Sequence, residues 1–319
     1  MGLTVEEFNL ALSNKIEEVF GDLFTVERSS VMKNNNTKRN CLLVRQKELN
    51  VSSVIYTDEE YREYCKGATF DNVAKQVISL VERQNKKKSE LHGFKNILKD
   101  FVEWEKIEDR VFYKIVRFMN NTEYLYDKPY VKHNDLAIVF GILVDNNKAT
   151  DGVASITVSK QHMANWNINI CDLLSAAIRN TPVMFPKLLR NMEDILREAF
   201  RDFNPGGIED NILEEYPMFD TNKPEMYVLS NTIGVNGASA IFYPNCMKDI
   251  SKELGFKKIV IIPSSIHEVI LVEYTSDLEA TALKEMIMSV NAEQVPIEEI
   301  LSDHPYIYDS EADKIFSMK

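Results

Sequence analysis

The residues best suited to catalysis stand together near position 265. Ser264, Ser265, His267 and Glu268 fall within five positions and combine hydroxyl, imidazole and carboxylate groups. The apolar residues that follow predict a strand over 266–274, and side chains alternate between the two faces of a strand. Ser265 and His267 would therefore share one face at hydrogen-bonding distance, while Glu268 would point to the opposite face.

This pattern predicts a hydrolase or transferase site centred on His267. A serine nucleophile needs an acid behind the histidine. Because Glu268 would lie on the wrong face, that acid must come from elsewhere. Asp303 or His304 is a further candidate member of this site. The segment contains no Gly-x-Ser-x-Gly elbow, and Leu271 stands where a zinc-protease helix has its second histidine. The alternative is a structural histidine bonded to a backbone carbonyl beside a Pro-Ser-Ser turn.

A second group of candidates lies in the glycine-containing turn over residues 230–238. Here Asn231 and Gly237 are candidates for binding phosphate through backbone amides. A dinucleotide-binding turn needs Gly-x-Gly-x-x-Gly at the start of a helix, whereas this turn has Gly-x-x-Gly. No cofactor is therefore predicted, and the alternative is a tight turn that needs positive backbone angles.

A third group follows in the segment 301–309. Asp303 and His304 are candidates for an acid–base pair, with Tyr306 beside them as a binding residue. The alternative is an irregular tail whose tyrosines pack on the body of the protein. The five histidines of the chain show no ligand spacing, so the sequence predicts no metal site.

The chain resembles an uncharacterised bacterial family, a domain of unknown function common in anaerobic Gram-positive bacteria. The resemblance runs almost from end to end, and Ser53 is a small departure where proline is expected. It implies family membership and no particular activity, cofactor or partner. Its most specific segments are Leu229-Ser230-Asn231, Gly237-Ala238, Pro263-Ser264-Ser265-Ile266-His267-Glu268, Val290-Asn291 and Leu301-Ser302-Asp303-His304-Pro305-Tyr306-Ile307-Tyr308.

The elements that must position these residues indicate an α+β fold with antiparallel or mixed sheets. Strands are predicted in meanders and hairpins and helices in runs, without the strict alternation of a doubly wound sheet. Two lobes are expected, over residues 1–205 and 206–319, because Asn204-Pro205-Gly206-Gly207 is the strongest break in the chain. The end of the second lobe, residues 295–316, is expected to be mostly irregular.

The charge is unevenly distributed along the chain. Residues 1–160 hold 24 bases and 24 acids, so the 13 bases and 25 acids of residues 161–319 account for the whole net charge of −12. An acidic balance disfavours nucleic-acid binding, which needs clustered lysine and arginine. We therefore expect a binding or interaction protein that meets a protein partner through its acidic second half, with the His267 hydrolase or transferase as the alternative.

The sequence predicts a cytoplasmic location. No apolar run approaches the ~18–20 residues that a membrane helix needs, and the N-terminus lacks the basic and apolar regions of an export signal. The four cysteines are far apart, without a Cys-x-x-Cys pair, and are expected to be reduced thiols. They are Cys41, Cys65, Cys171 and Cys246.

Overall fold

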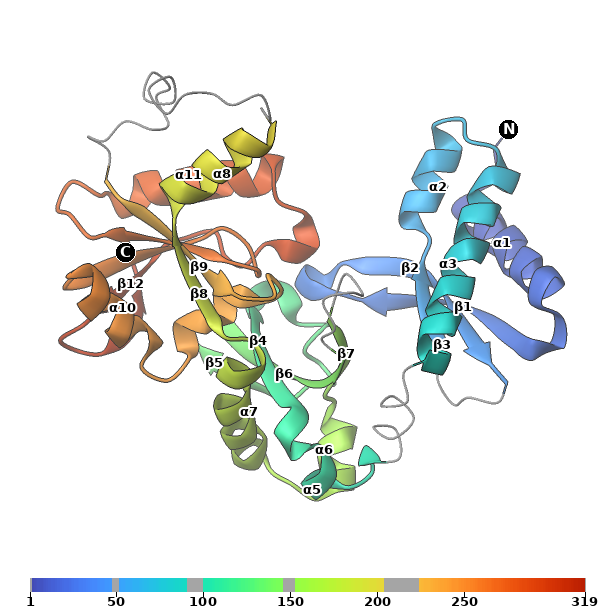
Figure 1. Ribbon diagram of the computed structural model, residues 1–319, viewed down its shortest axis with the longest axis horizontal. Helices are drawn as coiled ribbons and strands as arrows, with labels where there is room; N and C mark the ends of the chain where they lie inside the picture. The colour runs from blue at the N-terminus through green and yellow to red at the C-terminus, as the bar shows by residue number, and fades with distance from the viewer. Residues whose placement is uncertain (1, 48–51, 91–99, 146–152, 204–223, 319) are drawn as a thin grey trace. The chain divides into compact units, whose positions relative to one another are not determined.

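A computed structural model describes residues 2–47, 52–90, 100–145, 153–203 and 224–318 (Figure 1). The chain forms two compact units, Met1–Lys99 and Asp100–Lys319. Each unit has its own sheets and its own hydrophobic core. The expected α+β class is confirmed, and every sheet is antiparallel.

The first unit is a three-stranded meander covered by helices. The strands follow the order β1-β2-β3. Phe8, Leu12 and Ile16 recur on one side of the first helix and pack on Leu42 and Val44 of the second strand, because a helix presents every third or fourth residue to the same side. The elements are α1 (Val5–Phe20), η1 (Gly21–Leu23), β1 (Phe24–Met32), η2 (Asn34–Asn36), β2 (Lys38–Gln46), β3 (Ser52–Tyr56), α2 (Asp58–Cys65) and α3 (Phe70–Glu90).

The second unit begins with a four-stranded sheet. Its long, apolar β6 lies between β4 and β5 and also pairs with β7. The helix α7 packs on β4, where the Thr181 hydroxyl accepts a hydrogen bond from the backbone N–H of Tyr113 (3.0 Å). The elements are α5 (Trp104–Ile107), η3 (Glu108–Arg110), β4 (Val111–Arg117), η4 (Met119–Asn121), β5 (Tyr130–His133), β6 (Leu136–Asp145), β7 (Ala154–Thr157), α6 (Lys160–Trp166) and α7 (Ile170–Met184).

A six-stranded sheet completes the second unit, in the order β13-β12-β10-β11-β9-β8. The helices α8 and α11 lie on one face (Figure 1), while α10 and η7 pack into the main core. The elements are β8 (Lys187–Asn191), α8 (Met192–Phe203), β9 (Met226–Asn231), η7 (Gly237–Phe242), α10 (Cys246–Leu254), β10 (Lys258–Pro263), β11 (Val269–Glu273), α11 (Ala280–Glu293), η8 (Ile297–Glu299), β12 (Tyr306–Asp309) and β13 (Lys314–Ser317).

Alternation along the central strand β10 places its side chains in two separate cores. Ile259 and Ile261 belong to the main core of the second unit, whereas Val260 and Ile262 pack with Ile287 of α11. Successive side chains of a strand point to opposite faces, so a strand covered on both faces is apolar throughout. Both sides of this sheet are therefore buried at its centre.

The division between the two units differs from the expected lobes. The predicted boundary near residue 205 lies within the second unit, because β8 precedes it, β9 follows it, and the two strands pair directly. The breaker Asn204-Pro205-Gly206-Gly207 itself lies outside the described residues. A strong local break in the sequence therefore does not separate the two sides of this sheet.

The C-terminal segment also differs from expectation. Instead of an irregular tail, residues 306–309 and 314–317 form two strands at one edge of the six-stranded sheet. Tyr306 and Tyr308 are two positions apart, so both face the core, and both are buried. This agrees with the alternative in which the tyrosines pack on the body of the protein. No helix in the described part of the chain is long and apolar enough to cross a membrane.

Candidate functional site

The first group of predicted residues surrounds a turn rather than a strand. Residues 264–268 join β10 to β11, so the strand predicted over 266–274 starts only after this turn. The backbone N–H of Ser265 donates to the Glu268 carbonyl (3.2 Å), and the Ser265 hydroxyl accepts from the backbone N–H of His267 (3.0 Å). A serine hydroxyl bonded to a nearby backbone group stabilises such turns. The expected distribution of these side chains on two strand faces is wrong.

The His267 imidazole lies between a backbone amide and a carboxylate. Its Nδ1 accepts from the backbone N–H of Asn236 (3.2 Å), which leaves the proton of the neutral ring on Nε2. This Nε2 lies 3.8 Å from a carboxylate oxygen of Glu299. The acid facing the histidine is therefore Glu299, whereas Glu268 accepts from the Ser264 hydroxyl (3.4 Å). Sequence reasoning missed Glu299 because only the fold brings η8 beside this turn.

The four catalytic candidates are neighbours without forming a nucleophilic unit. Among the described residues, neither Ser264 nor Ser265 exchanges a hydrogen bond with the imidazole, and each hydroxyl is bonded elsewhere in the turn. A serine nucleophile requires its hydroxyl to be bonded to the histidine that takes its proton. In this conformation the turn orients an imidazole but activates no hydroxyl.

Asn231 and Gly237 belong to the glycine-containing segment that joins β9 to η7. The buried Asn231 side chain accepts from the backbone N–H groups of Ile233 (3.0 Å) and Gly234 (2.9 Å) and donates to the Val235 carbonyl (2.8 Å). These amides are therefore already bonded within the protein rather than open to a phosphate. The glycine-containing segment has the tight-turn geometry given above as the alternative to phosphate binding.

Gly237 is required by a close approach of two backbones. A Cβ at this position would collide with the Ser230 hydroxyl and lie 2.5 Å from the His267 carbonyl oxygen. The same Ser230 hydroxyl donates to that carbonyl (2.7 Å). The start of η7 is thus pressed against the His267 turn, and only glycine fits between them.

The third group of predicted residues surrounds a carboxylate that the sequence analysis did not single out. The Tyr306 hydroxyl donates to one oxygen of Asp135 (2.7 Å), and the Ser302 hydroxyl donates to the other (3.3 Å). The Nε2 of His304 lies 3.5 Å from Asp135, and its Nδ1 lies 3.4 Å from the Ser302 hydroxyl. Asp135 precedes β6, and its position as a charged residue at the start of an apolar run was the available signal.

Asp303 points away from His304 and binds another part of the unit. Its carboxylate pairs with Arg117 at the end of β4 and accepts from the side-chain amide of Asn291 (3.3 Å). The predicted acid–base pair of Asp303 and His304 does not form. Asp303 contacts Arg117 and Asn291 instead, and His304 lies beside Asp135. The two contacts of Asp303 connect the segment before β12 to β4 and to α11.

Burial and hydrogen bonding together determine the protonation of this cluster. Burial raises the pKa of Asp135. The hydrogen bonds from His304 and Tyr306 and the charge of His304 together lower this pKa by more, so the pKa of Asp135 lies below its ordinary value. Burial chiefly raises the pKa of Tyr306. Ser302 has no exposed surface (0%), so its hydroxyl cannot meet an external substrate. The cluster joins the two sheets, and its serine is too deeply buried to act as a nucleophile on an external substrate.

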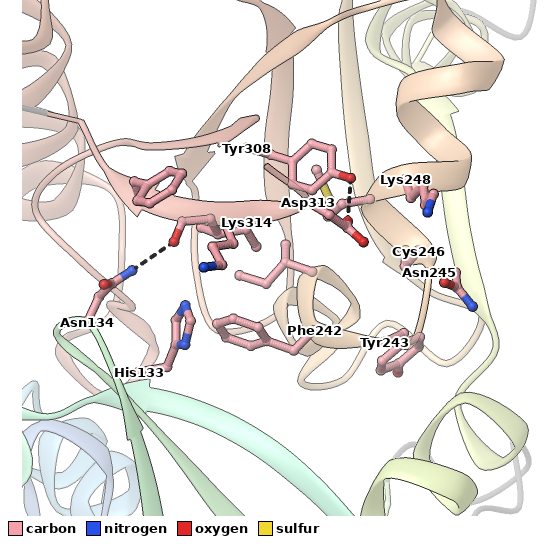
Figure 2. A pocket seen from close by; sticks show the side chains of 14 residues that line it. His133, Asn134, Phe242, Tyr243, Asn245, Cys246, Lys248, Tyr308, Asp313 and Lys314 are labelled. Carbon is pink, nitrogen blue, oxygen red and sulfur yellow. Dashed lines mark hydrogen bonds between the residues drawn. The ribbon is translucent and has the colours of Figure 1, made fainter. Parts of the chain in front are cut away.

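A cavity of about 420 Å³ opens elsewhere in the second unit (Figure 2). Its wall comes from the end of β5, from η7, from the start of α10 and from the β12–β13 hairpin. The Asn134 side chain crosses from one wall to the other and donates to the Ile315 carbonyl (3.3 Å). The sequence offered no motif for this site, because its lining comes from four separate segments.

The lining combines rings with cationic side chains. The His133 ring meets the Phe242 ring edge to face, with centroids 4.9 Å apart, and Figure 2 shows the Lys314 side chain reaching over these rings. Lys248 contributes a second ammonium group. An apolar pocket with a few polar groups at its edge is typical of a small-molecule site.

The described residues contain no group of three histidine, cysteine or acidic side chains that could hold a metal ion. Comparison with curated proteins and with solved structures found no match. The model of the Family of unknown function (DUF5688) matches residues 5–310, nearly the whole chain. The chain therefore belongs to this family of unknown function, as the resemblance of its sequence segments implies.

Proposed function

We propose that this is a binding protein whose acidic second unit takes a small molecule into the cavity between β5, η7, α10 and the β12–β13 hairpin. The single observation that supports this is the cavity itself, because about 420 Å³ falls in the range of small-molecule sites, roughly 300–1,000 Å³. The proposal differs from the protein partner expected for the acidic second half, because it takes a small molecule as the ligand.

The chemistry of the lining favours binding over catalysis. Burial raises the pKa of the Cys246 thiol to about 11, so the thiol stays protonated and is a poor nucleophile near neutral pH. The Tyr308 hydroxyl donates to Asp313 (2.7 Å), and burial, with this bond, raises the pKa of Tyr308. The hydrolase or transferase alternative would instead require the His267 turn to rearrange so that a serine reaches the ring.

The cavity can be tested with a neutral fluorescent probe, phenylnaphthylamine, in the full chain. We expect the probe to bind and to gain fluorescence, and the variant His133→Trp to weaken binding because the larger ring fills space beside Phe242. Tyr126→Trp is the matched control, since Tyr126 is exposed (83%) and lies outside the cavity lining. Equal binding by wild type and His133→Trp would contradict the proposal.

A protein partner for the second unit is the second candidate function. The first unit, residues 1–99, holds 16 bases and 14 acids, which leaves 21 bases and 35 acids for residues 100–319. An acidic surface would attract a basic partner, and salt would weaken that attraction because exposed charges are screened beyond ~8 Å at physiological ionic strength. A partner that stays bound to the full chain at high salt would contradict this candidate.

A further inference from the structure

We propose that the ligand of this cavity is an organic anion: an apolar, ring-sized body that carries a carboxylate, sulfonate or phosphate group. This inference rests on the proposed function and names the chemical class of its ligand. Its first support is the sign of the local charge. Although the second unit carries 35 acids and 21 bases, two lysines and a single acid line the cavity, namely Lys248, Lys314 and Asp313.

The single acid of the lining is already engaged. Asp313 adopts a left-handed backbone conformation (φ 51°) in the β12–β13 turn, and its carboxylate accepts from the Tyr308 hydroxyl (2.7 Å). Figure 2 shows this carboxylate directed to the tyrosine. Asp313 therefore serves the hairpin, and its charge is committed to a neighbouring hydroxyl.

The two lysines keep their charge available to a ligand. In the described part of the chain, neither Lys248 nor Lys314 forms an ion pair. Lys258, on the same sheet, is paired with Asp309 at 3.4 Å. An ammonium group beside an apolar wall gives a point charge that an anionic headgroup can meet. The lysines thus provide the anion-recognising part of the cavity.

The rest of the wall fits an apolar body. Phe242 and His133 form one ring pair, and Phe316 on β13 exposes 44% of its surface at the rim. Aromatic rings favour edge-to-face or offset contacts with another ring. A flat apolar group packed against this ring pair would place an attached anion near Lys314, which Figure 2 shows above His133.

Two fluorescent probes distinguish recognition of the anionic group from binding of the apolar body. Anilinonaphthalene sulfonate carries a sulfonate, whereas phenylnaphthylamine has the same ring system without a charge. We expect Lys248→Met and Lys314→Met each to weaken sulfonate binding about two- to fivefold, the range of an exposed ion pair, and to leave binding of the neutral probe unchanged. Lys284→Met, an exposed position on α11 outside the cavity, is the matched control.

The outcomes distinguish this inference from the proposed function. If both probes bind and respond to His133→Trp, but the lysine variants leave the sulfonate unaffected or weaken both probes equally, the anionic ligand is ruled out and the binding cavity stands. If neither probe responds to His133→Trp, the proposed function fails and the inference with it. Thermal unfolding of each variant confirms that the measured protein is folded.

Discussion

At the scale of single residues, Asp135 shows why the surroundings of the predicted residues Asp303, His304 and Tyr306 could not be derived from local spacing. Its two oxygens receive hydrogen bonds from Tyr306 and Ser302, and His304 lies beside it. These three residues stand together in one of the segments that carry the family resemblance. Their shared partner is more than 160 positions earlier in the chain, and it comes close only because the four-stranded and six-stranded sheets pack together.

The Asp135 carboxylate is expected to stabilise the fold in a pH-dependent way. Because its pKa lies below the usual value in the folded protein, its contribution is present above about pH 4 and is lost as the pH falls through the folded-state pKa. Asp135→Asn should lower the free energy of unfolding at neutral pH by about 1–3 kcal/mol, the cost of leaving buried partners unsatisfied. Urea denaturation at neutral and acidic pH measures the difference.

The control for this experiment is Asp109→Asn, which removes an exposed carboxylate. We expect Asp109→Asn to match wild type at both pH values, and the deficit of Asp135→Asn to shrink in acid as the wild-type carboxylate becomes protonated. A constant deficit at all pH values would show that the carboxylate charge is not what stabilises the cluster.

At the scale of elements, the His267 turn depends on its neighbours. The 3-10 helix η7 begins against the turn, and its first residue, Gly237, allows the Ser230 hydroxyl to reach the His267 carbonyl. The element η8 brings Glu299 to the other side of the imidazole. The elements β9, η7 and η8 therefore surround one histidine, which explains why a segment of five residues could suggest a site without defining it.

Replacing Gly237 should disturb this arrangement. The variant Gly237→Ala adds a Cβ that collides with Ser230 and the His267 carbonyl, so we expect a loss of about 1–3 kcal/mol in the free energy of unfolding, as for other overpacked sites. Thr232→Ala is the control, since Thr232 is exposed in the same turn. Equal urea midpoints for the two variants would contradict the close packing.

At the scale of the whole molecule, the two units have separate cores. The core of the first unit lies entirely within residues 1–99. The main core of the second unit extends from Ile107 to Tyr308 and so includes residues on both sides of position 205. A division at residue 205 would cut the pairing of β8 with β9 and open this core to water.

Fragments of the chain test this division. We expect residues 1–99 and 100–319, produced separately, each to unfold cooperatively, because each keeps its sheets and core. Residues 1–205 and 206–319 are the comparison pair, and the second of these should lack a cooperative transition, because it loses β8 and the four-stranded sheet. Circular dichroism during thermal unfolding measures this. A cooperative transition in residues 206–319 would instead support the boundary near residue 205.

The sequence by itself determined the α+β class and the family membership, because these depend on local periodicity and on short segments of the chain. The tertiary structure alone decided that residues 264–268 form a turn and that four segments enclose a cavity. It also decided that Asp135 lies beside His304 and Glu299 beside His267. Periodicity reports which face of an element is apolar. It does not report which distant element covers that face, because this depends on how whole sheets and helices pack.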